Sequence, residues 1–169
     1  VTPGIKEGTF PSIWKRGKVV PVHKRGALNK IENYRPVCLF SNLGKLLELV
    51  VRRQFSTHLE QILPDNVYGF RSGRSTQDAV CHVLDSIHEA RSEGKYVAIL
   101  SMDASCAFDI INHDVILKSL EIVGVGPLMR KWSESFLKDC SNFVQIDNAV
   151  SESWPVETGS GQGRRLSPD

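Results

Sequence analysis

Apolar residues recur at helical spacing in four stretches of the chain. The first stretch follows Ser41, a residue type favoured as a helix N-cap, and reaches as far as Pro64, which a helix cannot continue through. The second begins at Ser75, where Asp78 completes a weak capping box, and stops before Gly94. The two shorter stretches are residues 113–123 and 128–137. The pattern predicts four helices.

Shorter apolar runs predict strands between these helices. Residues 18–23 include Pro21, which has no N–H to donate and therefore favours an edge position. Residues 95–102 form a mostly apolar run closed by Asp103, which is typical of a buried central strand. A half-exposed strand and its hairpin partner are predicted at residues 143–147 and 150–157. Because strands and helices do not alternate regularly, the sequence favours an α+β fold over a doubly wound sheet.

Composition places the chain among globular proteins. It has 169 residues, of which 41% are hydrophobic and 24% charged, so one domain with a sizeable core is expected. The sequence has no run of 18 apolar residues and no signal peptide, which predicts no membrane contact and an intracellular location, cytoplasmic or nuclear. The first residue is not Met, so we expect the chain to start inside a longer reading frame. The four cysteines are scattered without a C-x-x-C pair, which predicts free thiols rather than zinc ligands or disulfides.

Basic residues are concentrated in the N-terminal part of the chain. Residues 1–35 hold eight Lys or Arg and two acidic residues, a net charge of +6, whereas the whole chain carries +2. Such an arm suits a polyanionic partner, and a solvated lysine-rich loop explains it equally well.

Asp103 is the sharpest candidate for chemistry. It follows the predicted buried strand, so a rigid element would hold its carboxylate at an exposed strand end, where a hard cation such as Mg2+ could bind. Taken alone, an Asp at this position more simply caps the strand and starts a turn. A second carboxylate, Asp109, lies six residues later in the segment MDASCAFDIINH.

Six segments, in order along the chain, resemble motifs of the reverse transcriptases of non-LTR (LINE-type) retrotransposons. The first catalytic motif of that family has an apolar strand, Asp, a small linker, Ala-Phe-Asp and then His. The corresponding residues here are Asp103, Ala107, Phe108, Asp109 and His113. The other matching segments are FPSIWK (10–15), VPVHKRG (20–26), NYRPV with KLLE (33–37 and 45–48), YGFRSGRST (68–76) and GQGRRLSP (161–168). Together they cover nearly the whole chain, which makes the resemblance strong.

The resemblance implies an α+β fold with the fingers and a partial palm of a right-hand polymerase, in which the antiparallel palm sheet is incomplete. Residues 1–95 would form a fingers-like region with the basic arm, and residues 96–169 a partial palm that ends within the QG motif. The implied activity is that of an RNA-directed DNA polymerase, which transfers nucleotides from dNTPs to a primer 3′-hydroxyl by two-metal chemistry. The implied partners are an RNA template, a DNA primer, dNTPs and the rest of the retrotransposon polyprotein. The implied cofactor is a pair of Mg2+ ions, with Mn2+ as an alternative.

The same resemblance implies roles for residues around the first catalytic motif. Asp103 would be the catalytic carboxylate and a ligand of both metal ions, and the backbone carbonyl of Ala104 a ligand beside it. Phe108 falls at the family's steric gate, where an aromatic ring beneath the sugar excludes a ribose 2′-hydroxyl; a buried core Phe is the simpler alternative. No catalytic role follows for His113.

Other residues would contact the nucleotide and the template. Lys24 and Arg35 would bind the triphosphate, since a guanidinium donates hydrogen bonds in pairs; a surface salt bridge is the alternative for Arg35. Gln162 and Gly163 match the dNTP-facing part of the QG motif. The candidates for template phosphate contacts are Arg71 and Arg74.

Two departures from the family pattern bear on activity. Arg164 and Arg165 stand where the family has a small and an apolar residue. Burying two adjacent guanidinium groups is costly without partners, which predicts a degenerate copy or a disordered end. The family's second carboxylate motif, an aromatic-x-Asp-Asp hairpin, lies beyond the QG motif, and the chain stops at Asp169. We therefore expect the isolated chain not to polymerise at a measurable rate.

Two interpretations without catalysis stay open. In one, the chain is a nucleic-acid-binding remnant of a degenerate transposon copy that uses residues 1–35 and the GFR segment, and it binds RNA or DNA with strong salt dependence. In the other, the chain is a relic with no biochemical role. Nucleic-acid affinity measured at two salt concentrations separates them.

Overall fold

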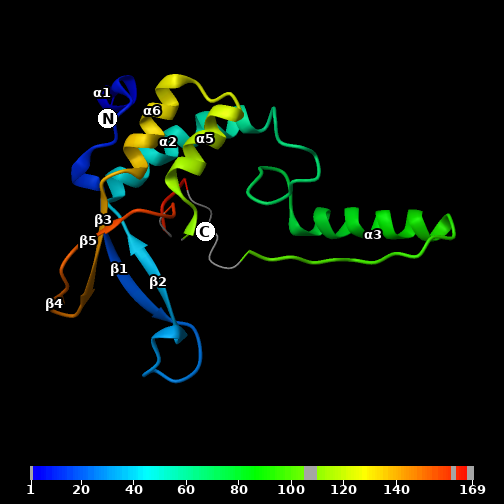
Figure 1. Cartoon of the computed structure of the whole chain (residues 1–169), viewed down its shortest axis with the longest axis horizontal. Coiled ribbons are helices and arrows are strands. Elements are labelled where there is room, and N and C mark those ends of the chain that lie inside the picture. Colours follow the sequence, from blue (N-terminus) through cyan, green and yellow to red (C-terminus); the bar gives the residue numbers. More distant parts are fainter. Residues whose placement is uncertain (1, 105–109, 161–162, 167–169) are drawn as a thin grey trace. The chain divides into compact units, whose positions relative to one another are not determined.

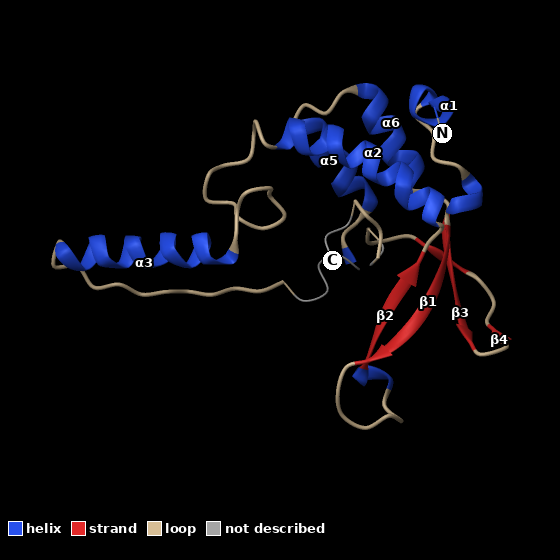
Figure 2. Cartoon of the chain, turned by 180° about the vertical axis from the view of Figure 1, so that it is seen from behind, coloured by secondary structure: helices blue, strands red, loops and turns tan. Residues whose placement is uncertain are grey.

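The computed structural model describes residues 2–104, 110–160 and 163–166. The chain divides into two compact units, one comprising Val1–Gln54 with Cys106–Asp169 and the other Phe55–Ser105. The first unit contains a sheet with helices gathered at one of its ends, and the second contains one long helix with loops on either side (Figures 1 and 2). The predicted α+β class is confirmed. The division into fingers and palm at residue 95 stays a prediction.

The sheet of the first unit is built around strand β1 (Arg16–His23). This strand pairs antiparallel with β2 (Tyr34–Leu39) and parallel with β3 (Cys140–Ile146). Two short strands, β4 (Ala149–Val150) and β5 (Trp154–Val156), pair antiparallel with β3. The sheet as a whole is mixed, because the β1–β3 pair is parallel, whereas the described strands within residues 96–169 pair antiparallel with one another. That they form an incomplete palm sheet stays a prediction.

Pro21 explains how far the pairing on β1 extends. The sequence predicted an edge position for it, yet β1 lies between β2 and β3. The pairing with β3 covers only residues Arg16 to Val19 of β1, so none of the described strands pairs with Pro21 on that side. On the other side Pro21 lies opposite Pro36 of β2, so neither residue donates to the ladder there.

The four predicted helices are confirmed. They are α2 (Asn42–Leu59), α3 (Thr76–Ser92), α5 (His113–Ile122) and α6 (Pro127–Leu137). A short helix, α1 (Thr2–Glu7), and 3-10 turns at Ser12–Trp14 and Ile31–Asn33 complete the described elements. Ser75 caps α3, since its Oγ accepts the N–H of Asp78 at 3.2 Å while the Asp78 carboxylate accepts the N–H of Ser75 at 2.8 Å. No helix in the described ranges is long and apolar enough to cross a bilayer.

The segment predicted as a buried central strand is not a strand. Residues 95–104 have no regular secondary structure, and Tyr96, Leu100 and Met102 are exposed. A strand needs backbone partners on a neighbouring strand. None of the strands described in the chain pairs with this segment. The prediction is therefore wrong for this structure, because an apolar run becomes a central strand only when other strands flank it.

Aromatic residues dominate the core of the first unit. The ring of Phe10 packs edge-on against Trp132 and Phe136, with ring centroids 5.6 and 5.1 Å apart. From α2, Leu47 and Val51 are fully buried. A smaller cluster on one face of the sheet contains Val19, Cys38 and Phe40, with Val144 packed against it.

Candidate functional site

Asp103 lies in the second unit, near the end of the segment that the strand prediction covered. Its side chain is exposed, as is the adjacent Ala104. A carboxylate and a backbone carbonyl are the hard oxygen donors that Mg2+ prefers, so the donor chemistry fits the implied metal. The described residues contain no group of three or more His, Cys, Asp or Glu that could hold an ion, so Asp103 would supply only part of a metal site. Phe108 and Gln162, predicted to contact the dNTP, lie outside the described residues.

Arg71 and Arg74 bind within the loop that precedes α3. Arg71 donates to Glu60 at 2.9 and 3.2 Å and to two backbone carbonyl oxygens at 2.7 and 3.3 Å, and its side chain is only 6% exposed. Arg74 pairs with Asp65 at 2.8 Å and is 31% exposed. Arg71 thus fixes the shape of the loop, while the guanidinium of Arg74 is the more accessible of the two.

One face of the β1–β2 hairpin carries cations. Residues opposite each other in an antiparallel pair point to the same side of the sheet, and side chains alternate along each strand. The pairs Lys18–Leu39 and Val22–Arg35 therefore place Lys18 and Arg35 on one face. Arg16, two residues before Lys18, lies on that face as well. The buried Cys38 points to the opposite face, where the core lies.

The two predicted triphosphate ligands, Lys24 and Arg35, lie near the turn of this hairpin. The register pairs Arg35 with Val22, and the N–H of Lys24 donates to the carbonyl of Asn33 at 2.8 Å. Lys24 and Arg35 are both exposed. The structure thus brings these two residues together through the turn that connects β1 and β2.

Gly163 approaches β2 more closely than a residue with a side chain could. Its φ is +98°, and a Cβ added to it would lie 2.3 Å from the carbonyl oxygen of Cys38. Only glycine adopts this backbone conformation without strain. Since Cys38 and Arg35 belong to the same strand, the structure brings part of the predicted dNTP site to the strand that carries a predicted phosphate ligand.

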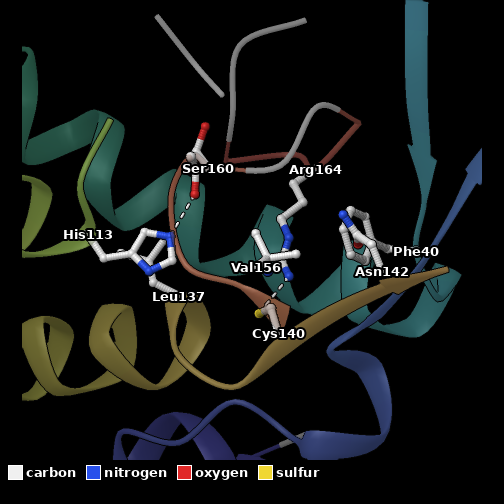
Figure 3. Close-up of a pocket in the computed structure, with 9 residues that line it drawn as sticks. Phe40, His113, Leu137, Cys140, Asn142, Val156, Ser160 and Arg164 are labelled. Atoms are coloured by element: carbon white, nitrogen blue, oxygen red, sulfur yellow. Dashed lines mark hydrogen bonds between the residues drawn. The ribbon is translucent and has the colours of Figure 1, made fainter. Parts of the chain in front are cut away.

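Arg164 is buried, and its guanidinium has aromatic and hydrogen-bonding partners. It is 4% exposed, and its Cζ lies over the rings of Phe40 and Phe136, 4.3 Å from each centroid. Figure 3 shows its side chain reaching Cys140 beside Phe40. It donates to the carbonyl of Phe136 at 3.3 Å, and it lies 3.1 Å from Sγ of Cys140. Arg165 is exposed. The cost of burying two adjacent guanidinium groups without partners therefore does not arise, because Arg165 is solvated and Arg164 has aromatic and hydrogen-bonding partners. That the chain is a degenerate copy stays a prediction.

Glu48 on α2 binds the backbone that follows Arg164. Its side chain is fully buried, and its Oε2 accepts the N–H of Arg165 at 2.6 Å. Burial raises the pKa of Glu48, while the hydrogen bond from the Arg165 N–H, the charge of Arg164 and the N–H of Leu166 act in the opposite direction. Glu48 thus contributes both a counter-charge for Arg164 and an acceptor for the turn.

His113 connects the end of the first catalytic motif to the segment before the QG motif. Nε2 of the buried His113 lies 2.8 Å from the carbonyl oxygen of Gly159 (Figure 3). A carbonyl can only accept, so Nε2 carries the proton. The N–H of Gly159 donates to the carbonyl oxygen of Ile111 at 2.8 Å, and Asn112 and Thr158 form an isolated antiparallel β-bridge. Both flanks of residues 161–162 are therefore fastened, by His113 on one side and by Arg164 on the other.

The cavity between these residues is small. It has about 20 Å³ of space, enough for about one water molecule. Its lining residues are Phe40, His113, Leu137, Cys140, Asn142, Val156, Gly159, Ser160 and Arg164 (Figure 3). The cluster is therefore an anchoring contact between segments and not a pocket for a nucleotide.

Sequence reasoning missed the roles of Glu48, His113 and Arg164, which fasten the flanks of residues 161–162. Glu48 and His113 belong to segments that match the family, and that match is the only sequence feature that points to a role for either residue. Arg164 departs from the family pattern, but its aromatic partners Phe40 and Phe136 lie 124 and 28 residues away along the chain. No local pattern indicates such a slot.

Comparison with known proteins shows a similarity that covers nearly the whole chain. Residues 22–169 match the family described as reverse transcriptase (RNA-dependent DNA polymerase). The chain therefore belongs to the reverse transcriptase family. It is related to the polymerases of non-LTR retrotransposons, as the sequence motifs predicted.

Three relatives from Drosophila melanogaster illustrate the relationship. A probable RNA-directed DNA polymerase from transposon BS is 30% identical over 94% of the chain, and the RNA-directed DNA polymerase from mobile element jockey is 27% identical over 95%. A putative 115 kDa protein in the type-1 retrotransposable element R1DM is 31% identical over 97%. The chain spans only 18%, 18% and 16% of the lengths of these relatives, respectively.

Proposed function

We propose that this chain is the part of an RNA-directed DNA polymerase that binds the incoming dNTP and the RNA template. The parent protein would add deoxynucleotides to a primer 3′-hydroxyl. Membership of the reverse transcriptase family over residues 22–169 carries the proposal. The position of Gly163 against the strand that bears Arg35 supports it. Because the polymerase acts on an element's RNA, we place it inside the cell.

Asp103 and the carbonyl of Ala104 would hold the metal ions, Mg2+ or alternatively Mn2+. The exposure of both residues leaves them accessible to an ion and to phosphate oxygens. When bound, the ion pair supplies a lowered pKa for the primer hydroxyl and charge neutralisation for the pyrophosphate leaving group. Phe108 would exclude a 2′-hydroxyl by its size, so that dNTPs are selected over NTPs.

The exposed cations would bind phosphates. Arg35 and Lys24 lie close together at the hairpin turn, where a bidentate guanidinium and a point charge can share a triphosphate. Gln162 and Gly163 would contact the sugar or base of the same nucleotide. The proposed template contacts are made by the loop that contains Arg71 and Arg74, with Arg71 holding the loop and Arg74 reaching the phosphates.

A second candidate function is nucleic-acid binding without catalysis. The exposed basic residues between β1 and β2 favour it, since Lys24, Arg25 and Lys30 all face solvent. Binding of this kind depends on phosphate charge and is insensitive to which dNTP is present.

The response to a matched dNTP distinguishes the two candidates. The 169-residue chain is titrated onto a fluorescent DNA primer annealed to an RNA template, with Mg2+, and each of the four dNTPs is added in turn. For a polymerase site, the dNTP that pairs with the next template base should tighten the complex, and Asp103→Asn should remove that response. A complex that all four dNTPs affect equally would support the second candidate and contradict the first.

Primer extension tests the catalytic step itself. We predict no measurable incorporation by the 169-residue chain alone, because Asp103 provides only part of a metal site within the described residues. Clear incorporation that Asp103→Ala abolishes would overturn this prediction.

A further inference from the structure

Gly163 has no side chain, so other residues must determine where its backbone lies. On one side it lies against the carbonyl of Cys38, with no room for even a methyl group. That contact limits how closely Gly163 can approach β2. The residues that follow Gly163 add attraction that keeps the segment in place.

Arg164 provides that attraction. Its guanidinium lies over the rings of Phe40 and Phe136, with Cζ 4.3 Å from each centroid, and both contacts are attractive. Its hydrogen bond to the carbonyl of Phe136 and its contact with Cys140 hold the guanidinium at two further points. A lysine side chain ends in an ammonium group, which is not planar and lacks the paired N–H donors of a guanidinium, so it cannot reproduce these contacts.

Glu48 completes the anchor from a separate element. It lies on α2, and its carboxylate accepts the N–H of Arg165 at 2.6 Å. Its negative charge also attracts the buried guanidinium of Arg164. Side chain and backbone of the segment are thereby bound at two points immediately after Gly163.

We propose that Arg164, supported by Glu48, is a positioning residue that holds Gly163 at the distance from β2 at which its backbone can contact an incoming dNTP. The inference rests on the proposed function, since it assigns Gly163 to the nucleotide. It also explains why this chain tolerates an arginine where the related motif has a small residue. The arginine fills a slot that a small side chain would leave empty.

Arg165 offers a matched control for testing this role. Arg164→Met and Arg165→Met each remove one positive charge, at adjacent positions and with the same new side chain. Arg165 is exposed and contacts Glu48 through its backbone N–H, which the substitution retains. Any difference between the two variants therefore reports on the buried guanidinium and not on net charge.

The experiment measures the affinity of the 169-residue chain for the matched dNTP on an RNA–DNA template–primer with Mg2+. Arg164→Met should weaken dNTP binding by about 10-fold, the change that about 1.4 kcal/mol produces. Arg165→Met should change it by less than about twofold. Template–primer affinity without dNTP should stay the same for both, because Gly163 faces the nucleotide. Arg164→Lys, which retains the charge and is the milder substitution for folding, should restore less than half of the loss in binding free energy.

Hydrogen exchange of the Arg165 amide provides a readout independent of the nucleotide. It should become faster in Arg164→Met and in Glu48→Gln, and remain slow in Arg165→Met. If Arg164→Met binds the matched dNTP as Arg165→Met does, the inference is wrong. It is also wrong if dNTP and template–primer affinity fall together, since Arg164 would then be merely structural. A wild-type chain that shows no preference for the matched dNTP would instead refute the proposed function, and this inference with it.

Discussion

Replacing Gly163 with alanine is the most direct test of how the segment docks on β2. The substitution adds one methyl group and changes no charge. It encounters two obstacles, the backbone conformation and the carbonyl oxygen of Cys38. Both can be expressed as energies from the structure.

The conformational term comes from the φ of +98°, which costs a non-glycine residue about 1–3 kcal/mol. The steric term comes from the contact of 2.3 Å with the Cys38 oxygen, because real Cβ atoms essentially never approach within 3.0 Å. The backbone would have to move by at least the difference, 0.7 Å. The obstructing atom belongs to a buried strand residue paired with Val19, so it cannot yield cheaply.

Together these terms predict a loss of about 3 kcal/mol in the free energy of unfolding. The loss is limited from above, because residues 163–166 can detach from β2 and leave the rest of the unit folded. Urea denaturation, followed by tryptophan fluorescence, measures it. With a slope of about 2 kcal/mol per M, the midpoint should fall by about 1.5 M. If the segment detaches instead, the midpoint moves less and the amide of Arg165 exchanges rapidly.

Gly73 provides the control. Its φ is +73°, but nothing lies within 4 Å of a Cβ added there, so Gly73→Ala tests the conformational term alone and should cost about 1–2 kcal/mol. If Gly163→Ala changes neither the midpoint nor the exchange of the Arg165 amide, Gly163 does not lie against β2 and the reasoning fails.

Two further predictions concern titration and capping. Burial raises the pKa of Glu48 above its ordinary value of 4.5. The folded chain therefore binds a proton on the Glu48 carboxyl more tightly than the unfolded chain does. The stability gained from this proton is complete below pH 4.5 and is lost as the pH rises through the pKa of the folded state. The stability of wild type relative to Glu48→Gln should therefore fall as the pH rises above 4.5 in urea titrations; a constant difference would contradict the assignment. Ser75→Ala should weaken the start of α3 by about 1 kcal/mol, because the acceptor for the Asp78 N–H is lost. Amide exchange in the first turn of α3 measures this, with the mid-helix Ser86→Ala as the neutral control, and equal exchange in both variants would refute the cap.

The alternation along β1 and β2 has a further consequence for function. It separates a cationic face, with Lys18 and Arg35, from a face that carries the buried residues Val19 and Cys38. Gly163 contacts the backbone of Cys38 at the strand itself. The segment can therefore be anchored in the core while its glycine stays close to the strand that presents Arg35.

Local sequence patterns were sufficient for much of this protein. The four long helices were predictable because their apolar period and caps involve residues only a few positions apart, as at Ser75 and Asp78. The six family motifs also identified the reverse transcriptase family and named Asp103, Arg35 and Gly163 as candidates, since residue type and spacing alone define a motif. These features need no knowledge of what packs against them.

Only the tertiary structure decided the features that depend on distant partners. The parallel pairing of Arg16 with Ser141 joins strands 125 residues apart, and no local signal specifies it. The run at 95–102 looks like a central strand by composition, yet it has no strand beside it in the described chain. Arg164 shows the same point for charge. The cost of burying its guanidinium depends on the ring contacts with Phe40 and Phe136 and on the nearby carboxylate of Glu48. Only the fold brings those three residues together.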